Sequence, residues 1–91
     1  MTVRWSPEAA ADFESIIAYI LEQNPSTADR IAHTIYSAVS PLDMLPNRGR
    51  PGRVEGTREL VLVPLPYVVV YRVQSDAVEI SQLLHGSQRW P

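Results

Sequence analysis

The chain has 91 residues, of which 45% are apolar, and its 8 basic and 10 acidic residues leave a net charge of −2. This composition is typical of one globular domain with a thin core, and a net negative charge gives no general attraction to nucleic acid. The absence of cysteine excludes disulfides, thiolate metal sites and cysteine nucleophiles, and no apolar run reaches the roughly 18–20 residues of a membrane helix.

The N-terminal part is predicted to form a short strand and a long helix. Thr2–Trp5 alternates polar and apolar residues, as a strand does. Ser6 and Pro7 then indicate a helix start, because serine caps free N–H groups and proline fits the first helical position. Apolar residues at three- and four-residue steps over Ala10–Leu21 predict a buried stripe. No cationic and apolar leader precedes these elements, so we expect one cytoplasmic domain over residues 1–91.

A second helix is predicted after the Asn24-Pro25 step, which ends the first. Ser26, with Asp29 three residues later, resembles a capping box, and the apolar spacing continues over Ala28–Leu42. Pro41 lies inside this stripe and would cost a helix interior about 3 kcal/mol. The second helix should therefore kink or restart near residue 40.

An arginine-rich loop is predicted next, since Pro46–Arg53 contains two prolines and two glycines in eight residues. Arginine presents a planar fork of donors that suits phosphate or carboxylate, so the loop could hold RNA, a nucleotide or an acidic partner; the alternative is a merely solvated loop. Because the loop has little apolar content, alanine at Arg50 and Arg53 should change stability by less than about 1 kcal/mol. We expect Trp90 and four arginines to contact the target; the arginines are Arg48, Arg50, Arg53 and Arg58.

Three strands are predicted after residue 57, where the periodicity changes. Arg58–Val63 and Tyr67–Gln74 are rich in valine and tyrosine and flank Pro64-Leu65-Pro66, and Val78–His85 follows a turn. The element order is then β-α-α-β-β-β. This order predicts an α+β fold, with a helical hairpin packed on one face of a small, four-stranded antiparallel sheet and Thr2–Trp5 at its edge or in its middle.

The strand at residues 67–73 is apolar on both sides. Alternation places Val68, Val70 and Arg72 on the side opposite the tyrosines. A sheet covered by helices on one face only should be polar on the other, so the two valines either lie under a loop of this chain or await a partner. With Arg72 beside them, they form the candidate contact surface for a partner protein.

Three segments together resemble the RelE/ParE toxin superfamily, and its ParE-like members more closely. They are Arg58–Val61, the strand Pro66–Val73 with its tyrosine–arginine end, and Val78–Trp90 with its histidine–glycine step. The likeness covers nearly the whole chain. It implies the toxin of a type II toxin–antitoxin system, neutralised by a cognate antitoxin that is often a DNA-binding dimer with an acidic tail. No cofactor or metal is expected.

The resemblance implies one of two activities. RelE-like members cleave mRNA on the ribosome, whereas ParE-like members inhibit DNA gyrase. Trp90 or Tyr71 could stack on a base of an RNA target. A nuclease also needs a proton-transfer group and cations that hold the phosphate, for which the candidates are His85, Arg50, Arg72 and Arg89.

One position departs from the ribonuclease pattern. RelE-like and YoeB-like toxins carry a central arginine three residues before the strand's tyrosine, and Val68 occupies that position here. The loop lysines of RelE are also missing, and arginine exchanges protons poorly because its pKa is too high. Gyrase inhibition is therefore the favoured function. The alternatives are ribosome-dependent mRNA cleavage and an inactive module that only binds the antitoxin or represses transcription with it.

Overall fold

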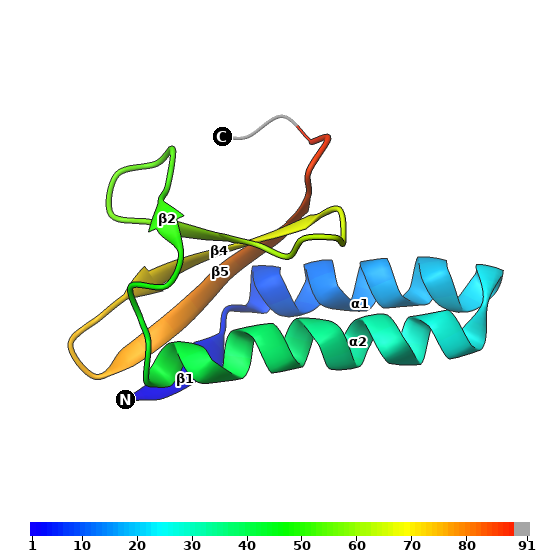
Figure 1. The fold of residues 1–91 in the computed structure, drawn as a ribbon, viewed down its shortest axis with the longest axis horizontal. Helices are drawn as coiled ribbons and strands as arrows, with labels where there is room; N and C mark the ends of the chain where they lie inside the picture. The colour runs from blue at the N-terminus through cyan, green and yellow to red at the C-terminus, as the bar shows by residue number, and fades with distance from the viewer. Residues whose placement is uncertain (89–91) are drawn as a thin grey trace.

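Two antiparallel helices cover one face of a five-stranded sheet in this computed structural model, which describes residues 1–88 (Figure 1). The predicted α+β class is confirmed, and so is the order of the main elements. In chain order they are β1 (Thr2–Trp5), α1 (Pro7–Gln23), α2 (Pro25–Val39), the 3-10 helix η1 (Ser40–Asp43), β2 (Arg50–Pro51), β3 (Arg58–Val61), β4 (Tyr67–Val73) and β5 (Ala77–His85).

The starts of both helices follow from local chemistry. Ser6 caps α1 as predicted, and its side chain accepts a hydrogen bond from the Ala9 N–H at 3.0 Å. The predicted capping box at Ser26 is wrong, because Asn24 is the cap of α2 and accepts from the Thr27 N–H. Pro25 can begin the helix directly after this cap, since proline has no N–H to satisfy.

The end of α2 agrees with the prediction for Pro41. The α-helix stops at Val39, and a 3-10 turn continues over Ser40–Asp43. Proline removes one helical hydrogen bond and crowds the preceding turn, which a tighter 3-10 turn accommodates. Leu42 in this turn is fully buried, so the apolar stripe of α2 continues across the change of helix type.

The sheet has the strand order β1-β5-β4-β3-β2 and differs from the prediction in two respects. At the edge, β1 pairs parallel to β5, with Thr2 opposite Ala77. Parallel pairing is possible because the helical hairpin, and not a tight turn, joins β1 to the other strands. The fifth strand, β2, lies inside the predicted loop and brings Arg50 opposite Glu59 of β3.

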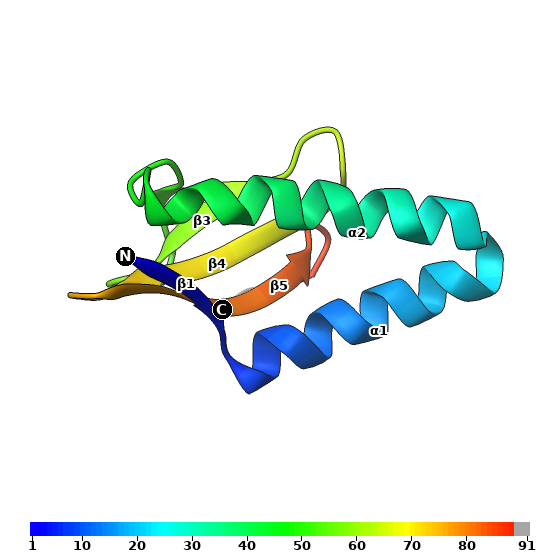
Figure 2. The same ribbon diagram turned by 90° about the horizontal axis from the view of Figure 1, so that it is seen from below.

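The core lies between the helices and the facing side of the sheet. Ile35, Val39 and Leu42 are buried there in one cluster with Val69 and Tyr71 of β4. Figure 2 shows that the helical hairpin extends past the sheet, with the turn between α1 and α2 lying beyond the strand ends. No helix within residues 1–88 is long and apolar enough to cross a bilayer.

A bulge in β5 adjusts which side chains face the core. The register of β4 with β5 steps from Val70–Gln82 to Tyr71–Ile80, so Ser81 is the extra residue. Because of this step, Ile80 and Leu83 both join the core cluster although they are three residues apart.

Candidate binding site

The second face of the sheet, away from the helices, is closed at its centre. Val68 is 9% exposed and Val70 is 1% exposed. Val54 and Thr57 of the loop between β2 and β3 line a pocket of about 240 Å³ together with Val70, so the chain's own loop lies beside this valine. Of the two alternatives for the valines, the structure favours cover by the chain itself for Val70. Arg72 lies half-buried at the margin of this face.

One buried carboxylate fastens the arginine loop to the sheet. The Glu59 side chain is 1% exposed, and its Oε1 accepts a hydrogen bond from Arg50 Nη2 at 2.9 Å. Its Oε2 accepts from the Arg53 backbone N–H at 3.0 Å and lies 3.7 Å from Arg53 Nε. Burial by itself raises the pKa of Glu59, but the hydrogen bonds and charges of Arg53 and Arg50 outweigh it and hold that pKa below its ordinary value.

The Glu59 contacts change the expectation for Arg50 and Arg53. Both arginine side chains remain about half exposed, so each still offers surface to a target. Both also compensate a charge that cannot reach water, which makes them part of the folded structure as well. Sequence reasoning treated the loop as structurally unimportant because the partner of its arginines lies in a strand.

Tyr71 and Arg58 hold the start of the loop. The Tyr71 hydroxyl donates to the Pro46 carbonyl at 2.7 Å and accepts from the Gly49 N–H at 2.8 Å. Arg58 Nη1 donates to the Gly49 carbonyl at 2.7 Å and lies 3.4 Å from the Asn47 carbonyl. Tyr71 is fully buried, so the expectation that it could stack on a base is wrong. Arg58 likewise stabilises the loop, through its hydrogen bond to the Gly49 carbonyl.

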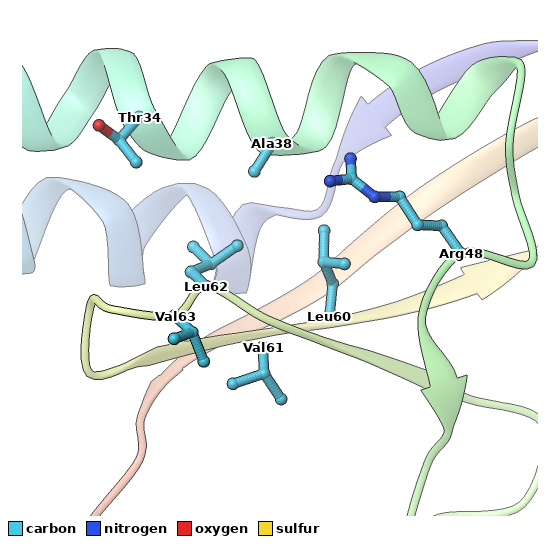
Figure 3. Close-up of a pocket in the computed structure, with 7 residues that line it drawn as sticks. All are labelled: Thr34, Ala38, Arg48, Leu60, Val61, Leu62 and Val63. Carbon is cyan, nitrogen blue, oxygen red and sulfur yellow. The ribbon is translucent and has the colours of Figure 1, made fainter.

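A groove of about 120 Å³ lies between α2 and β3 (Figure 3). The Arg48 side chain extends along it toward α2, above Leu60. Within residues 1–88 the Arg48 guanidinium has no hydrogen bond or ion pair, in contrast to the arginines around Glu59. The groove thus combines apolar side chains with one uncompensated cation, and it is lined by Thr34, Ala38, Arg48, Leu60, Val61, Leu62 and Val63.

Among residues 1–88, the edge of the sheet beside this groove is open. In β3, β2 pairs only with Arg58 and Glu59. The Leu62 N–H donates to the Tyr67 carbonyl, so by alternation the backbone groups of Val61, the last residue of β3, point away from β4. A strand edge without a neighbour is a template for pairing with another chain.

Exposed apolar side chains surround Arg48 on both sides. Val61 is 40% and Val63 81% exposed on the strand side, and Met44 is 80% and Leu45 58% exposed where the loop begins. Met44 and Leu45 line a second hollow that also includes Arg48. Contiguous apolar surface of this kind is typical of a protein-binding site.

The four nuclease candidates are not brought together. His85 lies opposite Tyr67 and lines a pocket beneath α1, whereas Arg72 lies opposite Glu79 at the other end of β4. Five residues of strand separate the two positions by roughly 16 Å, and Arg72 points to the opposite face. Arg50 on β2 lies opposite Glu59 of β3, two strands away from Arg72. Arg89 and Trp90 lie outside the described residues.

Ser87 engages one nitrogen of the exposed His85 ring. Its Nδ1 accepts from the Ser87 N–H at 3.1 Å, which assigns the ring proton to Nε2 in the neutral form. Burial, and to a lesser extent Tyr19, raises the pKa of the neighbouring Tyr67, so that hydroxyl stays protonated near neutral pH. Within residues 1–88 no three His, Asp or Glu side chains are placed to hold a metal ion.

Sequence reasoning missed Glu59 and the groove. A single acid directly before the apolar run Leu60–Val63 of a predicted strand was the available signal for a buried partner of the loop arginines. For the groove, the signal was the unbroken apolar run Leu60–Val63, which leaves no polar side for solvent.

Comparison with known proteins identifies the family. The profile described as ParE toxin of the type II toxin–antitoxin system parDE matches residues 3–90. The chain belongs to this family. It is the toxin component of a type II toxin–antitoxin system, and its partner is a cognate antitoxin.

Similar proteins carry both names of the superfamily. Toxin RelE2 of Caulobacter vibrioides is 37% identical over 86 residues, which cover 94% of this chain and 96% of the relative. The structure of a chromosomal ParDE toxin–antitoxin system from P. aeruginosa superposes with a TM-score of 0.86 at 30% identity, covering 93% of this chain and 95% of the other. The toxin–antitoxin complex RelBE2 of Mycobacterium tuberculosis gives a TM-score of 0.64 at 26% identity, covering 92% and 95%.

Proposed function

We propose that this ParE-family toxin arrests growth in the cytoplasm by inhibiting DNA gyrase, and that a cognate antitoxin neutralises it. The observation that carries the proposal is the separation of the nuclease candidates. His85 faces α1 at one end of β4, while Arg72 and Arg50 face the other side of the sheet at the opposite end. General acid–base cleavage requires these groups around one phosphate. Val68, in place of the arginine of RelE-like nucleases, supports the same conclusion.

Ribosome-dependent mRNA cleavage is the second candidate function. It is favoured by the relative named toxin RelE2 at 37% identity. The half-exposed arginines of the loop could meet ribosomal RNA as readily as they could meet a protein. The two candidates differ in whether His85 is needed.

Expression of the chain without its antitoxin should distinguish the candidates. We expect growth arrest with induction of the DNA-damage response, and cleaved DNA when the purified toxin is added to gyrase. The His85→Ala variant should arrest growth as strongly as the native chain, because this exposed side chain has no role in the proposed mechanism. Cut mRNA together with loss of toxicity in His85→Ala would instead support the ribosomal mechanism. Normal growth with either chain would support an inactive binding module.

We also propose that the antitoxin occupies the groove between α2 and β3. The original expectation placed it on Val68, Val70 and Arg72, but a partner on that face would meet the covering loop and Arg72 before the buried valines. The groove offers the exposed side chains of Val61 and Val63, and backbone groups of Val61 that no strand pairs with among residues 1–88. An antitoxin segment that is disordered when free can order in such a groove.

A pair of valine variants tests this docking site. Val61 in the groove and Val73 at the far end of the sheet are each 40% exposed, so aspartate should be tolerated by the fold at both. Val61→Asp should weaken antitoxin binding at least about tenfold, because it introduces a charge into an apolar interface. Val73→Asp should change the affinity less than about twofold. Equal effects of the two variants in a calorimetric titration would contradict docking in the groove.

A further inference from the structure

The free guanidinium of Arg48 is placed in the groove by residues that lie outside it. The loop segment before and after Arg48 is held at two points. Pro46 and Gly49 are bound to the Tyr71 hydroxyl at 2.7 and 2.8 Å, and the Gly49 carbonyl is bound to Arg58 at 2.7 Å. Arg48 lies between these anchors, so its backbone has little freedom to move away from the groove.

Gly49 makes the fit of this segment close. A Cβ atom at position 49 would lie 2.8 Å from the Tyr71 ring and hydroxyl and 2.9 Å from the Glu59 carbonyl oxygen. Real side chains do not approach so closely, so the loop backbone sits directly on Tyr71. The hydroxyl of Tyr71 is buried, and its two bonds are therefore not exchanged readily for bonds to water.

We propose that Arg48 binds a carboxylate of the antitoxin segment in the groove, and that Tyr71 and Arg58 are positioning residues for Arg48. The proposal rests on the docking site proposed above. The chemistry of the ligand follows from charge complementarity, since the guanidinium is the one cation lining this groove and has no partner among the described residues. A guanidinium binds carboxylate through two parallel hydrogen bonds and depends on orientation more than lysine does. An arginine preordered by its loop loses less entropy when it binds.

A double-mutant cycle tests the positioning role. We expect Arg48→Ala to weaken binding of the cognate antitoxin at least about tenfold, the usual scale for a charged hydrogen bond. In the Tyr71→Phe background the same Arg48→Ala change should weaken binding less than about threefold, because the loop no longer presents the guanidinium. A purely structural role of Tyr71 would lower stability but leave the full effect of Arg48→Ala on affinity.

A second pair of variants keeps the test valid if Tyr71→Phe does not fold. Arg58 is half-buried and outside the core, so Arg58→Ala should remain folded. In the Arg58→Ala background, as in the Tyr71→Phe background, Arg48→Ala should cause a smaller loss of antitoxin affinity. In the Arg58→Lys background, where lysine can donate to the Gly49 carbonyl, the loss should be partly restored. If Arg48→Ala weakens binding equally in all backgrounds, the positioning proposal is overturned. If Val61→Asp and Arg48→Ala both leave binding unchanged, the groove itself is not the antitoxin site.

Discussion

A Val70→Asp variant should lose about 3–5 kcal/mol of its free energy of unfolding, the range seen when a charge is left buried without a partner. Val70 is 1% exposed and lies opposite Glu59 on β3 and Gln82 on β5. The new carboxylate would face an existing one across the strands, and like charges directly opposite each other destabilise a sheet. Urea unfolding of the purified chain measures the difference.

Val63→Asp is the matched control for this variant. Val63 is 81% exposed, so the same substitution there should change stability by less than about 0.5 kcal/mol. Native stability of Val70→Asp, together with lost antitoxin binding, would show that the second face opens in solution. The original expectation of an antitoxin surface at Val68 and Val70 would then apply.

The double variant Arg50→Ala, Arg53→Ala should lose about 3 kcal/mol at neutral pH, because it leaves Glu59 charged and buried without cations. This exceeds the change of less than about 1 kcal/mol that the loop composition predicts. Adding Glu59→Gln should restore much of the loss, since an amide has no charge to compensate. Stability within about 1 kcal/mol of the native chain would mean that water reaches Glu59 and that the arginines serve only a target.

The contribution of Glu59 to stability should depend on pH with opposite signs in the native chain and in the Arg50→Ala, Arg53→Ala double variant. The lowered pKa of Glu59 in the native fold means that its contribution to stability is present above the ordinary pKa that glutamate has in the unfolded chain, and is lost as the pH falls through the lower pKa of the folded state. In the double variant, burial outweighs the retained hydrogen bond from the residue 53 backbone and raises the pKa. The contribution of Glu59 to stability is then lost as the pH rises. The difference in free energy of unfolding between the double variant and the native chain should therefore become smaller at acidic pH.

These contacts bear on how the toxin divides its arginines between folding and recognition. The side chains of Arg50, Arg53 and Arg58 each contact a group of this chain, whereas the Arg48 side chain does not within residues 1–88. An arginine cluster in a sequence therefore overstates the surface available to a target. The arginines that lack an internal partner are the ones from which contact with another molecule is best predicted.

The sequence by itself determined both helices, the start of α1, the break at Pro41, and the strands β1, β3, β4 and β5. Ser6 and Pro7 act on the N–H groups of the next turn, Pro41 acts on the turn before it, and alternation in Tyr67–Val73 sets its two faces. All of these effects join residues a few positions apart. The order of segments, together with the tyrosine–arginine and histidine–glycine strand ends, was also sufficient to indicate the toxin family that the profile confirms.

Only the tertiary structure decided what the functional residues contact. Glu59 meets Arg50 because β2 pairs with β3, and His85 is kept from Arg72 because the register of β4 and β5 puts them at opposite ends. The parallel pairing of β1 depends in the same way on strands far apart in the chain. A one-residue change of register would reverse the faces of a strand, and no local pattern fixes the register between distant segments. The site is therefore a property of strand pairing, whereas the elements that carry it are a property of the sequence.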